Sequence, residues 1–486
     1  MRFLKGLSFY IFIIFLSIFQ FCRPHKDNLH TKKYPASQLK RDAELFKDVV
    51  LAMHPVIGVY KPREYYKTKF EKFVASLSDS LTEKQFRTRL KLLIDDLHCG
   101  HTEVIASKEY LKEEYKLKLN YSPYIFLPVG DRVYLASNLN KKQDSTLKKG
   151  MEIISINGVK VDSMLRYCRR FISGDGFNQT GKYYYSQMAF NTYYLSLFGR
   201  PDTFEVEYKN GKESSKLKYR AIKLKSLPPL PLEPRADSLF VKYKRAKMGY
   251  RYLDKDKTVM TLKIEKFSHR KAAKAYRKIF RKLNKNRTKN LVIDLRGNGG
   301  GSLANSYRLL SYLIDQPQKQ TLRTGIKNYP YKKYTHGNAW FKLTRYVYKI
   351  IGEKKTVNDT DNFSYTIKPR KRNHFSGKIY VLINGGSFSA SALVASYLKY
   401  NNRAVFIGQE TGGALEGCNA GITPYYKLPN TKVRIRVPAF RIVHDVEPTI
   451  TGHGIMPDYE IRYEVKDIFK KQNLELLKAK ELLKID

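Results

Sequence analysis

Two stretches of the chain each have the pattern of a buried strand that runs directly into a turn of small residues and then into a helix. Residues 378–383 are apolar and β-branched, and a small-residue segment at 384–392 follows them before apolar residues return at helical spacing. Residues 290–295 repeat the strand pattern and run into residues 297–301, which hold four glycines in five positions. Buried strands that alternate with helices indicate an α/β core.

Ser389 stands in the first of these turns, at the expected start of the helix. The first N–H groups of a helix have no partner inside it, and the helix dipole is positive at this end, so a negatively charged oxygen beside Ser389 would be stabilised. The residues alone leave two interpretations open. Ser389 is either a catalytic nucleophile or an N-cap among small residues that let the helix pack closely on the strand.

The glycine-rich turn at 297–301 favours the catalytic interpretation. It has neither a Gly-Lys-Ser/Thr ending nor a Gly-x-Gly-x-x-Gly pattern, which disfavours a phosphate-binding loop. Glycines allow backbone conformations and close approaches that side chains forbid. The turn is therefore expected to offer backbone N–H groups to a developing oxyanion.

Three motifs in this order carry a family resemblance, and they read Asp294-Leu295-Arg296-x-Asn298-x-Gly300-Gly301, Gly386-Ser387-x-Ser389-Ala390-Ser391 and Asn402-Arg403-Ala404-x-x-x-Gly408-x-x-Thr411-x-Gly413. With them, roughly residues 36–465 resemble the C-terminal-processing, or tail-specific, protease family. The resemblance implies a crotonase-like (ClpP/crotonase) α/β core over residues 257–465, with Ser389 as the nucleophile. It also implies an oxyanion hole formed by amides near Gly300 and Ala390.

One position departs from the bacterial processing proteases. Their general base is a lysine after a Gly-x-x-Thr-x-Gly segment, and this chain has Ala414 there. The related tricorn and retinoid-binding-protein-like branch instead takes a histidine from the N-terminal part of the core, and His101 lies in the corresponding place. Histidine has an unperturbed pKa of about 6.5 and can accept the serine proton and return it to the leaving amine. His98 is expected to be structural.

A carboxylate should orient the imidazole of the base. By analogy with the tricorn branch, Glu447 stands at about the right place along the chain, and Glu410 is the rival candidate. Sequence separation does not decide between them.

The N-terminus has the pattern of an export signal. Residues 1–21 combine a basic start with an apolar stretch that is short for a membrane span, and Cys22 follows them as in a loose lipobox. Cys22 is therefore expected to be lipidated, and residues 22–35 are expected to form a tether.

Residues 36–112 have apolar residues at helical spacing. A capping box at Thr82 is expected to open a helix from Phe86. These patterns predict a helical domain that delivers His101.

The middle of the chain predicts a different module. Residues 117–225 have strand character and a hairpin signal at Asn157-Gly158, resemble a PDZ-type module, and include a helical interruption at 164–198. Such modules bind an extended peptide along a sheet edge.

Three further segments complete the predicted organisation. Prolines indicate a linker at 226–256. Residues 316–372 are interpreted as an insertion over the active-site mouth, and residues 466–486 are predicted to be a C-terminal helix.

The charge of the chain is unusual. With 91 Lys and Arg against 44 Asp and Glu, the 486-residue chain carries a formal net charge of +47. This excess raises the possibility of a nucleic-acid partner. The basic residues are nevertheless spread over every segment, no nucleic-acid fold is recognisable, and an export signal would separate the chain from the genome. We therefore expect no nucleic-acid partner and a basic surface that favours anionic lipid or envelope polymers.

The cysteines and histidines argue against other chemistries. After lipidation of Cys22, only Cys99, Cys168 and Cys418 remain, which allows at most one disulfide. Cys99 lies outside a strand–helix turn, which disfavours a cysteine nucleophile. His98 and His101 lack the His-Glu-x-x-His spacing, so no metal site is expected, and the reaction needs no cofactor.

The sequence therefore predicts an exported, lipid-anchored serine endopeptidase of the bacterial cell envelope. Its substrates would be peptides or partly unfolded proteins. The alternative is a catalytically inactive peptide-binding protein of the same fold. The missing lysine supports this alternative, and the presence of both Ser389 and His101 argues against it.

Overall fold

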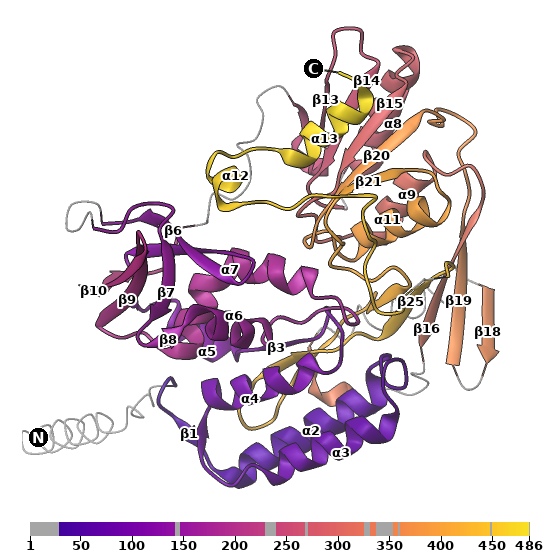
Figure 1. The fold of residues 1–486 in the computed structure, drawn as a ribbon. Coiled ribbons are helices and arrows are strands. Elements are labelled where there is room, and N and C mark those ends of the chain that lie inside the picture. Colours follow the sequence, from indigo (N-terminus) through magenta and orange to yellow (C-terminus); the bar gives the residue numbers. More distant parts are fainter. Residues whose placement is uncertain are drawn as a thin grey trace, which may run out of the picture.

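The computed structural model describes residues 29–140, 146–228, 240–267, 271–324, 331–336, 353–357, 360–447 and 450–485. An N-terminal helical region, a β-rich module and an α/β core follow one another along the chain (Figure 1). The predicted export signal, Cys22 and residues 229–239 of the linker lie outside the described residues. Within the described ranges, no helix is both long enough and apolar enough to span a membrane.

The N-terminal region is built from the helices α2 (Ala36–Met53), α3 (Arg63–Ala75) and α4 (Glu83–Asp95), with the short paired strands β1 (Lys33–Tyr34) and β2 (Leu81–Thr82). The predicted capping box is confirmed. Thr82 Oγ1 accepts a hydrogen bond from the Gln85 amide at 3.2 Å, and the Gln85 side chain accepts one from the Thr82 amide at 2.9 Å. The helix begins at Glu83 rather than at Phe86, because the residues inside a capping box already form the first turn.

The module contains a sheet with the strand order β10-β9-β7-β6-β5. Its strands are β5 (Tyr124–Val129), β6 (Arg132–Asn138), β7 (Glu152–Ile156), β8 (Val159–Lys160, paired with β7), β9 (Thr203–Asn210) and β10 (Glu213–Arg220). The predicted hairpin is confirmed, since Asn157 and Gly158 have φ values of 50° and 75°, as a type I′ turn requires. The helices α6 (Val161–Arg169) and α7 (Thr180–Phe198) form the predicted helical interruption.

Shorter elements connect the regions. They are β3 (Glu103–Ile105), α5 (Lys108–Glu114), β4 (Leu119–Tyr121), which pairs with β11 (Ile222–Leu224), and the 3₁₀ turns η1 (Lys244–Ala246) and η2 (Lys332–Tyr334). A four-stranded sheet joins β3 to the core through β24 (Arg434–Arg436), β23 (Tyr425–Lys427) and β17 (Thr335–His336). This sheet connects the segment that follows His101 directly to the C-terminal half of the chain.

The core is a seven-stranded sheet in the order β12-β13-β14-β15-β20-β21-β26, parallel from β14 to β26. Its strands are β12 (Val241–Tyr243), β13 (Met248–Tyr252), β14 (Val259–Ile264), β15 (Asn290–Asp294), β20 (Lys378–Ile383), β21 (Val405–Gly408) and β26 (Tyr459–Glu460). Alternate strand residues such as Ile293 and Val381 pack with the helices α8 (Ala272–Lys285), α9 (Leu303–Leu310) and α11 (Ala390–Tyr400). The opposite face, with Val292 and Leu382, packs on Ala479 of α13 (Leu474–Leu483).

Two predictions about the core need correction. The described parts of residues 316–372 are not a separate insertion, because they include strands of a second sheet, in the order β18-β19-β16-β25-β22. These strands are β16 (Gln318–Thr324), β18 (Glu353–Val357), β19 (Thr360–Ile367), β22 (Gly417–Ala420) and β25 (Phe440–His444). The cover over the active-site mouth stays a prediction. The C-terminal helix is divided into α12 (Val465–Phe469) and α13, because Lys471 has a φ of 55° and Asn473 caps a new helix.

The helical region is joined to the core by a buried carboxylate and by a shared apolar cluster. Asp42 of α2 has no exposed surface, and its oxygens accept hydrogen bonds from the backbone amide of Asn430 at 2.9 Å and from the amide and hydroxyl of Thr431 at 2.8 and 2.6 Å. Around it, Phe46 packs in one cluster with core residues such as Ile435. The helical region therefore docks on the core in one defined position.

We expect Asp42→Ala to loosen this docking. The variant leaves the buried donors of Asn430 and Thr431 without an acceptor, which should lower the free energy of unfolding by about 3 kcal/mol. Asp48→Ala on the same helix is the control, because Asp48 is exposed and lies 3.9 Å from Lys47 Nζ. Thermal unfolding followed by circular dichroism measures the difference, and equal melting temperatures for the two variants would contradict this role of Asp42.

Candidate active site

Ser389 lies where β20 turns sharply into α11. It is the N-cap of α11 and has φ 57° and ψ −120°, a conformation that L-residues rarely adopt. Strained strand-to-helix turns of this kind expose the Oγ of a nucleophilic serine in many hydrolases. Ser389 is half-buried, whereas Ser391 of the same motif is fully buried. The turn therefore presents Ser389 alone among its neighbours for chemistry.

The glycine-rich turn after β15 packs against this serine. Strands β15 and β20 are parallel neighbours, so both turns leave the same edge of the sheet. Gly300, at φ +96°, is so close to the second turn that a Cβ atom built on it would lie 2.7 Å from Ser389 Cβ and 2.9 Å from the Ala390 nitrogen. The Phe388 amide also donates to the Asn298 carbonyl oxygen at 3.1 Å. The two motifs thus form one unit.

The two residues predicted to form the oxyanion hole differ in the hydrogen bonding of their N–H groups. Ala390 is the first residue of α11, and its N–H group has no acceptor within the helix. The Gly300 N–H group donates to the side-chain oxygen of Asn298 at 2.9 Å. Of the two predicted donors, the Ala390 amide fits the role as the structure stands, and the Gly300 amide is engaged by Asn298.

His101 is brought to the serine from a distant part of the chain. Its Nε2 lies 3.1 Å from Ser389 Oγ, within hydrogen-bond reach, although 288 residues separate the two. The imidazole stacks on Phe388, with ring centroids 4.8 Å apart. His101 itself lies between α4 and β3, and β3 pairs with β24 of the core, so the docked N-terminal region holds the imidazole in place.

Burial keeps this imidazole neutral. The loss of solvent, and to a lesser degree the positive charge of Arg436, lower the pKa of His101 from 6.5 to about 3. A neutral imidazole with an available nitrogen lone pair is the form that accepts a proton. His98 has a different role: its Nδ1 lies 2.8 Å from the Gly176 carbonyl oxygen and fixes a loop, as expected for a structural histidine.

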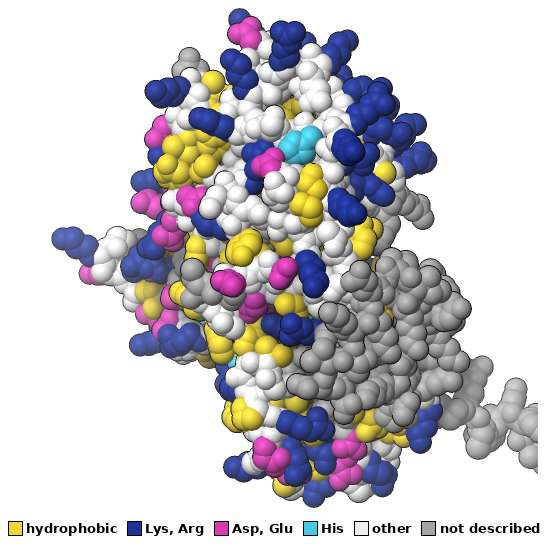
Figure 2. Space-filling view, turned by 90° about the vertical axis from the view of Figure 1, so that its right-hand side faces the viewer, with side chains coloured by type: hydrophobic (Ala, Val, Ile, Leu, Met, Phe, Trp, Pro, Cys, Tyr) yellow, Lys and Arg dark blue, Asp and Glu magenta, His cyan; other side chains and the backbone are white. Residues whose placement is uncertain are grey.

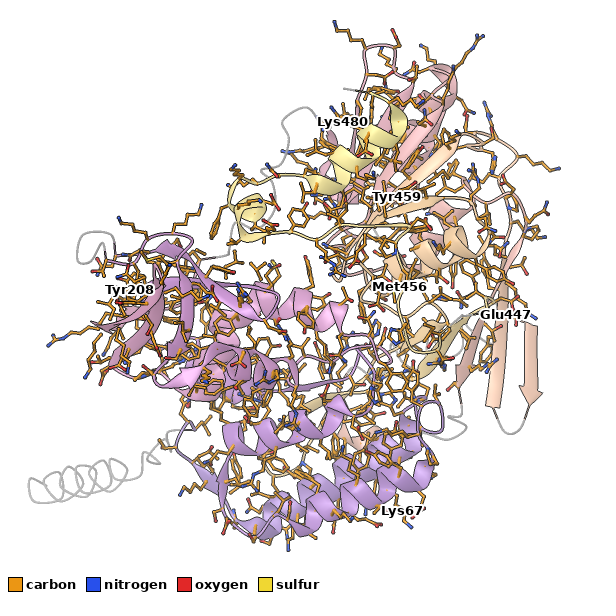
Figure 3. All side chains as sticks on the ribbon, in the orientation of Figure 1. Lys67, Tyr208, Glu447, Met456, Tyr459 and Lys480 are labelled. Atoms are coloured by element: carbon orange, nitrogen blue, oxygen red, sulfur yellow. The ribbon has the colours of Figure 1, made fainter. Side chains whose placement is uncertain are left out.

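Neither predicted carboxylate is hydrogen-bonded to His101. Glu447 is exposed, on the side of the core that carries β16 and β19 (Figure 3). Glu410 accepts hydrogen bonds from the Thr180 hydroxyl at 2.6 Å, from the Asn178 amide group at 3.0 Å and from the Gly454 backbone at 2.8 Å. These contacts make Glu410 a joint between the module and the core.

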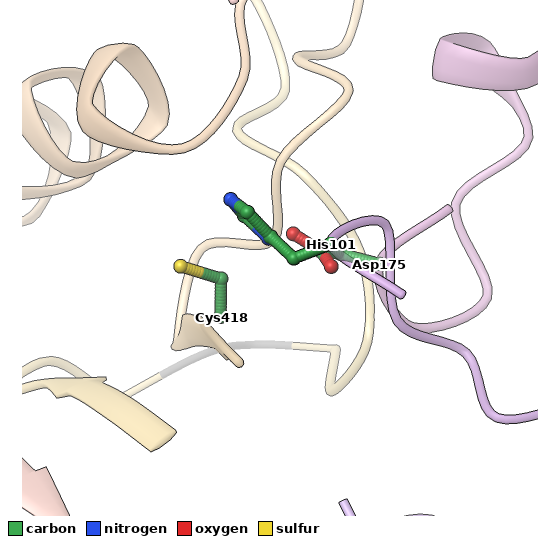
Figure 4. A group of neighbouring side chains, drawn as sticks. All are labelled: His101, Asp175 and Cys418. Atoms are coloured by element: carbon green, nitrogen blue, oxygen red, sulfur yellow. The ribbon is translucent and has the colours of Figure 1, made fainter. Parts of the chain in front are cut away.

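The structure places another carboxylate, Asp175, beside the base. A ring nitrogen of His101, a carboxylate oxygen of Asp175 and the Cys418 sulfur all lie within 4.8 Å of one another. Figure 4 shows Asp175 and Cys418 on either side of the imidazole. Sequence reasoning missed Asp175. In the sequence, Asp175 is marked only by its place between Gly174 and Gly176, which indicates a tight loop. This pattern does not show which residues the loop contacts.

Two further sequence positions have structural outcomes. Ala414, at the place of the family lysine, is buried and forms an isolated β-bridge with Gly454. The three cysteines of the described chain, Cys99, Cys168 and Cys418, are buried free thiols. The prediction allowed at most one disulfide, which agrees with this finding.

We expect Gly300→Ala to disturb the turn that carries Ser389. The added Cβ would meet Ser389 and the Ala390 nitrogen at less than 3 Å, and an ångström-scale displacement of a reacting group costs about 100-fold in rate. Gly158→Ala is the control, because Gly158 also has a positive φ, 75°, but open space around its Cβ position. The rate of labelling by a fluorophosphonate probe measures the effect, and equal rates for both variants would contradict the close packing of the two turns.

A family model and several solved structures are similar to this chain. Residues 258–461 match the model of peptidase family S41. The crystal structure of mature CPAF has a TM-score of 0.63 and 15% identity, covering 92% of this chain and 97% of that chain. Mature CPAF complexed with lactacystin also gives 0.63 and 15%, covering 92% and 98%. The photosystem II D1 C-terminal processing protease gives 0.41 and 14%, covering 89% and 97%.

No curated protein sequence matches the chain. The likeness to CPAF, at this identity, shows a shared fold over nearly the whole length of both chains. The family match covers both strand–turn–helix motifs and the segment around Ala414. Residues 258–461 thus match peptidase family S41, the C-terminal-processing proteases, and this match supports a serine-type peptidase.

Proposed function

We propose that the protein is an exported serine endopeptidase that cleaves peptides or partly unfolded envelope proteins, with Ser389 as the nucleophile and His101 as the base. One observation carries the proposal. The Ser389 hydroxyl, on a strained turn at a helix N-terminus, lies 3.1 Å from the Nε2 atom of a buried histidine. A hydroxyl is a weak nucleophile until a base takes its proton, and no other described histidine is hydrogen-bonded to Ser389.

The proposed reaction follows from these positions. His101 Nε2 removes the Ser389 proton while Oγ attacks the carbonyl carbon of the scissile bond, and the new oxyanion is stabilised by the Ala390 amide and the dipole of α11. The intermediate collapses when the imidazolium gives its proton to the leaving amine. Water, deprotonated by the same imidazole, then hydrolyses the acyl-enzyme and regenerates the Ser389 hydroxyl.

A histidine base explains the loss of the family lysine. With Ala414 at that position the family lysine is missing, and His101 supplies the base from the N-terminal part of the chain. This arrangement is the one proposed from the resemblance to the tricorn and retinoid-binding-protein-like branch. His101 can act as the base in place of a lysine, because burial keeps its imidazole neutral and therefore able to accept a proton.

Aromatic side chains of α7 support a peptide substrate. A Cβ atom built on Gly386 would lie 2.6 Å from Tyr184 Cζ, and one on Gly299 would lie 3.7 Å from the Tyr185 hydroxyl. These tyrosines therefore border both turns of the active site. Tyrosine combines an apolar ring with a hydroxyl, and this combination suits a peptide of varied sequence. The sheet edge of the module would hold the rest of an extended chain if it acts as a PDZ-type module.

We also propose that Cys22 anchors the protein to the bacterial cell envelope as a lipoprotein. The basic surface supports contact with anionic lipid, since Lys and Arg side chains are spread over both the core and the helical end of the face shown in Figure 2. A basic surface adds attraction to anionic lipid to the anchoring that the acyl chains at Cys22 would supply.

A fluorophosphonate probe tests the proposed nucleophile and base on the full-length chain. We expect the wild type to be labelled, Ser389→Ala to lose all labelling, and His101→Ala to be labelled at least 100-fold more slowly because the hydroxyl keeps its proton. Ser391→Ala, at a fully buried serine, and His374→Gln, at a histidine whose Nε2 lies 2.9 Å from the Ile314 carbonyl oxygen, are the matched controls and should be labelled like the wild type. A folded wild type that neither reacts nor cleaves unfolded casein would favour a peptide-binding protein instead.

Metabolic labelling with palmitate in a bacterial host tests the anchor. The wild type should incorporate the label and partition into detergent, because its acyl chains are apolar, and Cys22→Ala should lose both properties. Cys168→Ser, which changes a buried thiol, is the control and should keep both. Label retained by Cys22→Ala would argue against lipidation at this residue.

A further inference from the structure

We propose that Asp175 is the positioning residue for His101, and that it accepts the Nδ1–H hydrogen bond of the imidazole directly or through one water molecule. The inference rests on the proposed function, in which His101 is the base. It assigns the third member of the catalytic group to the module rather than to the core. Neither Glu410 nor Glu447 then needs to reach the imidazole.

The first observation is a pair of unsatisfied buried atoms. In the part of the chain that the structure describes, His101 Nδ1 and Asp175 Oδ2 are both buried and both lack a hydrogen-bond partner. Buried polar atoms without partners are rare, and each needs an explanation. The two residues belong to one cluster in which the contributing atoms lie within 4.8 Å (Figure 4). Hydrogen bonds of catalytic groups are often long without substrate and shorten when it binds.

The second observation is that Asp175 is held toward His101. Its other oxygen, Oδ1, accepts a hydrogen bond from the Gly100 amide at 2.8 Å, one residue before the base. The Gly176 amide donates to the His98 carbonyl oxygen at 3.0 Å, and the Ser173 hydroxyl donates to that of Thr102 at 2.9 Å. The loop that carries Asp175 therefore follows the segment of His101 on both sides of the base.

The same loop is fixed to the core. The Phe177 amide donates to the Gly452 carbonyl oxygen at 2.8 Å, and Asn178 donates to the Thr411 carbonyl oxygen at 2.5 Å. Asp175 is itself almost fully buried. A carboxylate that is rigidly placed beside a base, with one oxygen free for it, is the arrangement that fixes an imidazole in one orientation.

The proposal follows from the tautomer that the reaction needs. His101 Nε2 accepts the serine proton only if the ring proton is on Nδ1. An ionised Asp175 holds the proton there and stabilises the imidazolium that forms when Ser389 attacks. A protonated Asp175 would donate to Nδ1 instead and would place the ring proton on Nε2, where it blocks the transfer from Ser389.

The ionisation of Asp175 sets the expected pH dependence. Burial raises the pKa of Asp175 to about 7, against the lowering effects of the Gly100 amide and the positive charge of Arg441, while Glu416 adds to the increase. Besides these, the titratable neighbours of the carboxyl group are His101, Tyr60, Tyr185, Cys99 and Cys418. The base-competent form should therefore be lost as the pH falls through about 7, above the pKa of His101 itself.

The same cluster could also be taken for a metal site. Zinc binds a cysteine as the thiolate, at about 2.3 Å. Burial raises the pKa of the Cys418 thiol well above its ordinary value, so zinc would have to displace the thiol proton in order to bind. Addition of zinc in the experiment therefore distinguishes a metal site from a positioning carboxylate.

Asp175→Asn in the full-length chain tests the proposal. The asparagine oxygen can keep the hydrogen bond from Gly100, while its NH₂ group donates to Nδ1 and favours the wrong tautomer. We expect the second-order rate constant of fluorophosphonate labelling to fall by about 10³-fold to 10⁴-fold, as for removal of the charge in a serine triad. The wild-type rate should fall below pH 7, and this acid limb should be absent in Asp175→Asn.

Asp162→Asn is the matched control, because Asp162 is a solvent-accessible carboxylate of the same module that pairs with Arg166 at 3.0 Å, and this variant should keep the wild-type rate and pH profile. Circular dichroism and thermal unfolding establish that each variant is folded. If Asp175→Asn is folded and retains the wild-type rate and acid limb, the role of Asp175 is wrong while Ser389 and His101 remain catalytic. If zinc chloride blocks labelling of the wild type but not of Cys418→Ser, the cluster is a metal site and the proposal also fails. Absence of wild-type labelling would instead overturn the proposed function.

Discussion

The parallel pairing of β15 with β20 is the interaction on which the catalytic arrangement depends. The register joins Asp294 to Leu382, so the two strands end almost level and their turns leave the sheet side by side. Gly300 fills the narrow space between them, where any Cβ would collide with the turn of Ser389. Ser389 has a rare backbone conformation there, and its hydroxyl lies 3.1 Å from His101 Nε2. The proposed nucleophile is thus placed by the backbone of two neighbouring strands.

Buried polar contacts hold the other regions against this core. Asp42 and Glu410 each accept hydrogen bonds from a region of the chain other than their own. These hydrogen bonds form only in one relative position of the regions. Leaving a buried partner without a hydrogen bond costs more than an ordinary hydrogen bond gains. Apolar packing favours contact between the regions but does not fix their relative orientation. The hydrogen bonds of these carboxylates fix that orientation. The relative position of His101 and Ser389, on which a proton transfer depends, is therefore fixed by contacts far from the serine.

The buried carboxylates also differ in whether both of their oxygens accept hydrogen bonds. Both oxygens of Asp42 and of Glu410 accept hydrogen bonds, which is the pattern of a structural joint. Asp175 has one satisfied oxygen, which faces Gly100, and one unsatisfied oxygen in a cluster with His101. An incompletely satisfied charge stores free energy that is released when a proton moves or a substrate binds.

The sequence by itself determined the local elements: the two strand–turn–helix units, the capping box at Thr82 and the Asn157-Gly158 hairpin all follow from short-range patterns. It also singled out Ser389 and His101 as candidates, and the structure places them 3.1 Å apart. Only the tertiary structure decided that strands within residues 316–372 join a second sheet with β25, and that Asp175 lies beside His101. These outcomes depend on contacts between segments far apart in the chain, and such contacts leave no periodicity or spacing in the sequence from which they could be predicted.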